Sequence, residues 1–414
     1  MDWLFPAALA LTGTMGALMG LWGLWYLLSG LACIRKPLDY GFHPARTRFG
    51  ILIAARNEEL VIGPLINSLL MQDYPQELYD IWVVPNNCTD NTALAAERFG
   101  ARVLECTVPV KSKGEVLRFA YNRLRGQRYD AWLVFDADNV VDKRFLAEMN
   151  NARMAGAMAA QGYRDSKNPY DTALSGCSSI YYWMMDRFHN AGKAGLGLSA
   201  LIGGTGFMVT QRLLDRLGGW RTETISEDFE ITTQTILAGE RVAYVPKAVT
   251  YDEQPLTWEQ SAKQRRRWSS GTLQVAQAYL PAVGQQLGER PRLSVFDLGT
   301  TMGLPAYQLA ALVGLVCTAL TAALQGRTPL QALVLGLAAA FGNIAWAALT
   351  ATAAAAVVIT LEKKWDRRLW KALGTYWLFL LSWLPITAVT FWKRTTVWEE
   401  IRHTRTMAPQ LPGR

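Results

Sequence analysis

Four long stretches with few or no charged residues constrain this chain more than any other feature. The first, 4–34, carries no charged residue, and three apolar blocks follow near the other end, at 295–324, 330–361 and 373–392. Each is long enough to cross a bilayer, which takes about 20 mostly apolar residues in a helix. The first stretch is too long for the core of a signal peptide, so we expect a retained membrane anchor. Residues 40 to about 255 have the composition of a soluble domain.

Basic residues indicate how these segments are oriented. Arg35 and Lys36 follow the first stretch, whereas Asp2 is the only charged side chain before it. Because basic residues stay on the cytoplasmic side, we expect the N-terminus outside and the soluble domain in the cytoplasm, in a multi-pass protein of the cell (plasma) membrane. Basic residues also flank the three later blocks, and three simple crossings cannot place them all on one side. Either one block crosses twice or re-enters, or the rule fails there; Pro385 makes a broken helix an option.

Charge, cysteine and histidine content exclude several classes of protein. The net charge of +8 comes largely from Lys and Arg clusters at the membrane edges, so no nucleic-acid binding is expected. Five cysteines are scattered without metal spacing, which predicts free thiols. The three histidines lie far apart, which leaves neither a zinc site nor a histidine-based triad.

The soluble stretch alternates strand and helix patterns. Apolar runs at 49–55, 80–84, 102–106 and 131–135 predict strands, and helical segments separate them. This alternation predicts an α/β fold with a mainly parallel sheet and right-handed crossovers. Ligands of such sheets bind at the carboxyl ends of the strands.

Acids and amides gather where these strands end, in the loops 56–59, 86–90 and 136–138. Asp136 and Asp138 would supply oxygen ligands for Mg²⁺ or Mn²⁺, with substrate phosphates in the remaining positions. A solvated acidic turn is the alternative for that pair alone. No strand is followed by G-x-G-x-x-G and no P-loop is present, so a nucleotide diphosphate with a metal fits better than a dinucleotide.

Three motifs follow further along the chain. The glycine-rich segment 203–206 would let the backbone approach a ligand closely, or would form a tight turn. Glu227 and Asp228 open a helix after Ser226, where acids also suit the helix dipole. The segment 264–268, Gln-Arg-Arg-Arg-Trp, lies on a helix before the membrane region and could equally form a basic interfacial helix.

In this order, the Asp-x-Asp, Glu-Asp and Gln-x-x-Arg-Trp motifs resemble those of the family 2 glycosyltransferases. The resemblance extends to the membrane-embedded processive polysaccharide synthases, such as hyaluronan, cellulose, chitin and poly-N-acetylglucosamine synthases. It covers about residues 45–270 by motif and the flanking spans by layout. It implies a GT-A-like domain with transmembrane helices at both ends. The implied activity is inverting, metal-dependent hexosyl transfer from a UDP-sugar to a growing polysaccharide, coupled to export.

The resemblance assigns roles residue by residue. Nucleotide-sugar contacts are expected from Ala54, Arg56, Glu58, Asn86, Lys113, Asp136, Asp138 and Arg267. Acceptor contacts are expected from Gly204, Thr205, Gly206, Gln264 and Trp268. The metal, Mg²⁺ or Mn²⁺, is expected on Asp138 and Asp136, with Asp138 favoured as the direct ligand. Asp228 is expected as the general base, beside Glu227. The sequence departs from the family at Asn86, where an Asp often binds the base; an Asn oxygen can still accept from uracil N3–H.

The expected divisions are a transmembrane helix at 1–36, the catalytic domain at 40–255, interfacial helices at 256–290, a membrane region at 291–395 and a cytoplasmic tail at 396–414. One alternative is a non-processive transferase that adds one sugar to a membrane lipid, giving a glycolipid. Another is a transporter with a nucleotide-sensing domain, which the scarcity of charge in the apolar blocks disfavours. The sugar, the linkage and whether the protein forms a homo-oligomer are left open.

Overall fold

The computed structural model describes residues 3–35, 39–393 and 395, so the predicted tail at 396–414 lies outside the described residues. One twisted sheet runs through the soluble part, with the strand order β3-β2-β1-β4-β7-β6-β8-β5. Its strands are β1 (Phe49–Ala55), β2 (Tyr79–Pro85), β3 (Arg102–Val103), β4 (Ala131–Asp136), β5 (Val140–Val141), β6 (Ala159–Ser166), β7 (Phe207–Thr210) and β8 (Val242–Asp252). The predicted α/β class is confirmed.

The sheet is mixed, with its parallel half built as the sequence predicts. β1 pairs in parallel with β2 and β4, and β6 pairs in parallel with β8. β7 lies between β4 and β6 and is antiparallel to both. β1 is buried along its whole length, which explains why it is a continuous apolar run rather than an alternating one.

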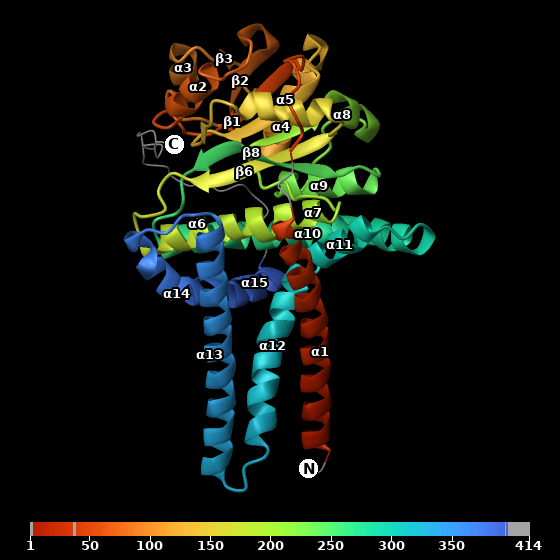
Figure 1. Cartoon of the computed structure of the whole chain (residues 1–414), viewed down its shortest axis with the longest axis vertical. Helices are drawn as coiled ribbons and strands as arrows, with labels where there is room; N and C mark the ends of the chain where they lie inside the picture. Colours follow the sequence, from red (N-terminus) through yellow and green to blue (C-terminus); the bar gives the residue numbers. More distant parts are fainter. Residues whose placement is uncertain (1–2, 36–38, 394, 396–414) are drawn as a thin grey trace.

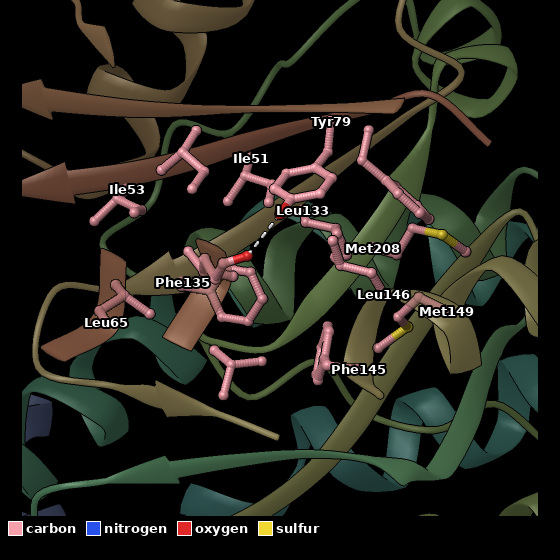
Figure 2. Close-up of a cluster of buried hydrophobic side chains, with 14 of the residues drawn as sticks. Ile51, Ile53, Leu65, Tyr79, Leu133, Phe135, Phe145, Leu146, Met149 and Met208 are labelled. Carbon is pink, nitrogen blue, oxygen red and sulfur yellow. Dashed lines mark hydrogen bonds between the residues drawn. The ribbon is translucent and has the colours of Figure 1, made fainter. Parts of the chain in front are cut away.

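Helices cover both faces of the sheet (Figure 1). They are α2 (Ile62–Leu70), α3 (Thr92–Arg98), α4 (Lys113–Leu124), α5 (Phe145–Met154), α8 (Gln211–Leu217) and α9 (Glu227–Leu237). Because side chains alternate along a strand, Ile51 and Ile53 of β1 face one core while Leu52 faces the other. Figure 2 shows the first core, where Leu133 and Phe135 of β4 meet Phe145 of α5.

Some predicted boundaries differ from the structure. The strand predicted at 102–106 contains only Arg102–Val103. The helix after β1 begins at Ile62. β7 begins at Phe207, so the glycine-rich segment before it is a turn, which was one of the two alternatives for that segment. These differences lie at element ends, where caps and tertiary contacts compete with local pattern.

Three long helices extend away from the sheet, α1 (Leu4–Leu31), α12 (Leu304–Ala323) and α13 (Pro329–Leu361) (Figure 1). Between them and the sheet lies a layer that includes α6 (Ala173–Met184), α7 (Gly192–Gly195), α10 (Trp258–Glu289) and α11 (Leu293–Met302). By length and composition, four helical segments could cross a membrane: Leu4–Ile34, Leu304–Ala323, Pro329–Leu361 and Arg367–Trp392.

The last apolar block does not form one straight helix. It divides at Ser382 into α14 (Trp370–Leu381) and α15 (Trp383–Trp392), which lie across the upper ends of α12 and α13 (Figure 1). Pro385 explains the break, because its ring clashes with the carbonyl four residues earlier and it has no N–H to donate. Arg265 of α10 stabilises this corner by donating to Phe379 O at 3.0 Å and to Ser382 Oγ at 2.6 Å.

The first C-terminal block is divided as well. Its opening residues belong to α11, which packs against α10, and the long helix α12 begins only after Gly303. A Cβ at Gly303 would lie 2.2 Å from the Trp22 ring, so the glycine lets α1 pack closely on this corner. Asp297 therefore lies on α11 and outside the long helix, where it pairs with Lys193 at 2.8 Å.

Candidate active site

The end of β4 is held by a buried lysine. Asp136 is the last residue of β4, and its Oδ1 accepts from Lys113 Nζ at 2.5 Å. Lys113 begins α4, after Ser112 caps the helix, and its Nζ also donates to Gly204 O at 2.7 Å. Burial works to raise the pKa of Asp136, but Lys113 lowers it overall, so the carboxylate is ionised. One ammonium thus ties strand β4 to the glycine-rich turn.

The turn 203–206 needs its glycines. Gly204 and Gly206 have φ of 88° and 61°, in the left-handed region that side chains disfavour. A Cβ at Gly206 would lie 2.8 Å from Thr250, and one at Gly204 would lie 3.3 Å from Asp228 Oδ2. Between them, Thr205 Oγ1 accepts from the Asp136 backbone N–H at 3.0 Å. The turn therefore holds Asp136 on one side and approaches Asp228 on the other.

Glu227 and Asp228 occupy the first turn of α9. Glu227 Oε1 lies 3.7 Å from Lys113 Nζ, which joins this helix to the end of β4. Burial raises the pKa of Glu227 to about 7, against the lowering effect of Lys113. Burial also raises the pKa of Asp228, whose Oδ1 accepts from the Phe229 N–H at 2.7 Å. A carboxylate whose affinity for protons is raised is suited to accept one.

The Gln-x-x-Arg-Trp segment lies near the start of α10. The charge of Arg267 adds to the effect of Lys113 that lowers the pKa of Asp136, and it opposes the burial that raises the pKa of Asp228, so it acts on both sides of the site. The Trp268 ring lies 6.1 Å from that of Tyr181, nearly parallel to it, and 6.0 Å from Trp383. Gln264 is half-buried on the same helix.

The loops after β1 and β2 meet beside this site. Ala54 lies opposite Asp136 in the parallel register of β1 and β4. Arg56 donates to Asn86 Oδ1 at 2.8 and 3.1 Å, and Asn86 Nδ2 donates to the Ala55 carbonyl at 2.9 Å. Asn86 is only 1% exposed. Its oxygen, expected to face the base, is therefore already engaged by Arg56.

Glu58 lies in the same loop, where its backbone N–H donates to Thr92 Oγ1 at 2.9 Å. The structure thus brings the three loops predicted at the sheet edge into one region. The individual roles predicted for their residues, Glu58 and Asn86 included, stay predictions.

The residues around Asp138 fit a hard divalent cation. Asp138 is buried, and its Oδ2 accepts from the Glu253 N–H at 3.1 Å. The charge of Asp138 is among the causes, after burial, that raise the pKa of Asp252 to about 6. Asp252 Oδ1 is buried and has no hydrogen-bond partner among the described residues. Those residues contain no ready cluster of three metal-binding side chains. This suits Mg²⁺ or Mn²⁺ bound by one or two carboxylates plus substrate phosphates, with Asp136 already held by Lys113.

Sequence reasoning missed two residues of the site. Arg164, near the end of β6, pairs with Asp252 Oδ2 at 2.5 Å, donates to Gly203 O and lies 4.2 Å over the Tyr182 ring. Asp252 ends β8. The signal that revealed Asp136, an acid directly after a long strand, was also present at Asp252. Arg164 carried no comparable signal, because its partners come from distant segments.

A cavity of about 390 Å³ extends from Asp228 to the long apolar helices. Gly203, Arg164, Tyr182 and Trp268 line it near the carboxylate. Its far wall comes from α1, α12, α14 and α15, through Tyr26, Leu304, Pro305, Tyr376, Leu380 and Trp383. Asp228 therefore lies between the Lys113–Asp136 pair and a mainly apolar cavity.

Comparisons with known proteins indicate the family and the fold of the chain. The model of the family described as "Glycosyltransferase like family 2" matches residues 44–271, more than half of the chain. The probable glycosyltransferase YdaM of Bacillus subtilis is 28% identical over 266 residues, which are 61% of this chain and 60% of that protein. The beta-monoglucosyldiacylglycerol synthase of Synechocystis is 25% identical over 60% of this chain and 52% of its own length. The matches thus span little more than half of these relatives.

Among solved structures, a mannosyltransferase from Pyrobaculum calidifontis, in complex with GDP-mannose and Mn²⁺, has the same GT-A-like fold. Its TM-score is 0.63 at 20% identity, and the alignment covers 92% of this chain and 98% of that one. The likeness therefore includes helices beyond the sheet domain.

Proposed function

The chain belongs to glycosyltransferase family 2, and from this premise we propose that it transfers one sugar from a nucleotide diphosphate sugar to the hydroxyl of a membrane lipid. The observation that carries the proposal is the position of Asp228. It lies beside the Lys113–Asp136 pair and also lines a cavity bounded by the membrane-facing helices. A donor on one side and a lipid on the other would meet at this carboxylate.

The donor diphosphate would bind at the carboxyl end of β4. Asp138 would hold a divalent cation, which supplies positive charge to the leaving diphosphate. Arg267 would add to that charge, since it already acts on Asp136. Lys113 would keep Asp136 ionised and in place. We propose a UDP-sugar as donor by resemblance, with Arg56 rather than Asn86 presented to the base.

Asp228 would act as general base. It takes the proton of the acceptor hydroxyl as the oxygen attacks the anomeric carbon, and the bond to the diphosphate breaks. A single base opposite the leaving group predicts inversion at that carbon. Glu227, which has a pKa of about 7, would help to hold Lys113 and Asp228 in place.

The lining of the cavity favours a lipid over a polymer. Met184, Met185, Phe188, Leu201 and Phe229 contribute to it beside the membrane-facing helices. Such a surface suits acyl chains, whereas a hydrated polysaccharide would leave hydroxyls unpaired. The relative from Synechocystis, named a beta-monoglucosyldiacylglycerol synthase, supports a lipid acceptor.

Polysaccharide synthesis remains the second candidate, favoured by the aromatic rings at the mouth of the cavity. Trp268 lies close to Tyr181, Tyr182 and Trp383, and flat rings can stack on sugars. Product size separates the two activities, because a polymer grows with time and a glycolipid does not.

We further propose that α1, α12 and α13 cross the membrane and that α14 and α15 lie in its interface. Arg35, Lys363 and Lys393 then all fall on the side of the sheet, which the positive-inside rule assigns to the cytoplasm. This arrangement removes the conflict among the basic flanks. Trp365, Trp370 and Trp392 are exposed near these ends, as expected of an aromatic belt.

The test uses the full-length protein in lipid nanodiscs with Mg²⁺ or Mn²⁺. A panel of UDP- and GDP-sugars is screened for release of the nucleoside diphosphate with and without added lipid acceptor. The proposal predicts lipid-dependent release and a product that carries one sugar. Release that yields only long water-soluble polymer would contradict it.

A further inference from the structure

The cavity beside Asp228 contains no positively charged side chain without a carboxylate partner. Apart from tyrosines, its ionisable lining side chains among the described residues are Arg164, Asp186, His189 and Asp228. Arg164 is the cation of this set, and its guanidinium already pairs with Asp252 Oδ2 at 2.5 Å and donates to Gly203 O. Its Nε–H has no hydrogen-bond partner among the described residues, but this atom is buried. The charge of Arg164 is therefore balanced by a carboxylate behind the cavity wall.

Burial favours the neutral forms of two other ionisable groups in the lining. Burial, helped by nearby Lys193, lowers the pKa of His189 well below its usual value. Burial raises the pKa of Asp186 well above its usual value, although its Oδ2 accepts from the backbone N–H of Arg164 at 3.0 Å. Lys193 itself pairs with Asp297 at 2.8 Å and is 1% exposed, so it adds no charge to the cavity surface.

The remaining cations near Asp228 belong to the donor side. Lys113 is bound to Asp136 and Gly204, and the charge of Arg267 also acts on Asp136. Neither lines the cavity. With the diphosphate of a donor in place, both would be engaged by its negative charge. An anionic acceptor group would then face Asp228 and the diphosphate without a cation of its own.

The presence of a base also indicates an acceptor with an uncharged hydroxyl. An alcohol must lose its O–H proton as its oxygen forms the new bond to the anomeric carbon, and Asp228 can take that proton. The electron pair of the breaking bond leaves with the diphosphate. A phosphate oxygen is already ionised near neutral pH and needs no base. With a phosphate acceptor, Asp228 at the mouth of the cavity would have no proton to accept.

From this charge distribution we infer that the acceptor is a neutral lipid alcohol, such as a diacylglycerol, and not a lipid phosphate. The inference rests on the proposed lipid-acceptor function and narrows its substrate class. The apolar lining takes the hydrocarbon chains, and the uncharged hydroxyl reaches Asp228.

Two pairs of acceptors that differ only in the phosphate test this inference. Full-length protein in phosphatidylcholine nanodiscs receives a UDP-sugar with either diacylglycerol or phosphatidic acid of the same chains. In parallel it receives either a polyprenol or the matching polyprenyl phosphate. We expect transfer to the alcohols at least about tenfold faster than to the phosphates. Equal or faster transfer to polyprenyl phosphate would overturn the inference while leaving lipid glycosylation standing. Transfer to none of the four would instead remove the proposed function itself.

A variant pair tests the cause of the preference. Asp252→Asn leaves Arg164 without its carboxylate, so the alcohol-to-phosphate rate ratio should fall at least about threefold whatever happens to the absolute rate. Asp130→Asn is the matched control, because it removes the carboxylate from another ion pair, with Arg153 at 3.0 Å, and neither residue lines the cavity. The control should keep the wild-type ratio. An unchanged ratio in Asp252→Asn would show that the Arg164–Asp252 balance does not set acceptor charge.

Discussion

Replacing Gly271 by alanine should disturb the base without touching the substrate. Gly271 lies on α10, where this helix crosses the start of α9. An added Cβ would lie 1.9 Å from Ser226 Oγ, 2.7 Å from Ser226 Cβ and 3.3 Å from its backbone N. Ordinary contacts between such atoms need about 3.5 Å. The Ser226 hydroxyl can rotate away, but Ser226 Cβ, at 2.7 Å, must still move by about 0.8 Å. Asp228 follows two residues later and should move with it.

The expected magnitude follows from that displacement. Overpacking of this kind lowers the free energy of unfolding by about 1–3 kcal/mol. Replacing a helical glycine by alanine raises it by about 1 kcal/mol. The net loss of stability is therefore small, at most about 2 kcal/mol. A shift of about 1 Å in a catalytic group can lower the rate about 100-fold. We expect kcat to fall by one to two orders of magnitude while the melting temperature changes little.

The assay is the initial rate of nucleoside diphosphate release at saturating lipid acceptor, with thermal unfolding measured in parallel. Gly284→Ala is the matched control on the same helix, since a Cβ added at Gly284 would meet no atom within 4 Å. It should keep full activity and gain stability. Adding Ser226→Gly to Gly271→Ala removes most of the clash and should restore part of the rate. Wild-type kcat in Gly271→Ala would refute the idea that α10 positions Asp228.

Three further predictions concern single side chains. Asp228→Asn should lower transfer by at least about 1,000-fold and leave nucleotide binding nearly unchanged, as measured by calorimetry; normal turnover would exclude Asp228 as the base. Burial raises the pKa of Glu227 from 4.5 to about 7, so the folded state holds this proton more tightly than the unfolded state. Its stabilising contribution is then full below about 4.5 and is lost as the pH rises through about 7. The melting temperature should fall over that range, and less so in Glu227→Gln. Arg265→Met leaves Ser382 Oγ without the donor Arg265 and leaves Phe379 O with only the Ser382 hydroxyl as side-chain donor, and should cost about 1–3 kcal/mol. It should also raise the KM for the acceptor, since α10 carries Trp268; an unchanged KM and melting temperature would contradict this.

Much of the architecture can be inferred from local pattern. Continuous apolar runs followed by acids predict β1 and β4 and place Asp136 at the edge of the sheet, because burial on both faces leaves a signature in consecutive residues. The long apolar segments are equally visible, since their length alone matches the thickness of a bilayer. The order of the Asp-x-Asp, Glu-Asp and Gln-x-x-Arg-Trp motifs was enough to indicate the family.

Other features depend on contacts between distant segments. Arg164 pairs with Asp252, which is 88 residues away on another strand, and Asn86 accepts hydrogen bonds from Arg56. Neither contact can be inferred from neighbours in the chain. The same holds for the last apolar block. Pro385 allows a break, but the direction of α14 depends on packing against α6 and α13, and that of α15 on packing against α10 and α12. The cavity beside Asp228 is built from segments as far apart as Tyr26 and Trp383. Periodicity reports which face of an element is buried, whereas charge pairing and cavity shape depend on which elements meet there.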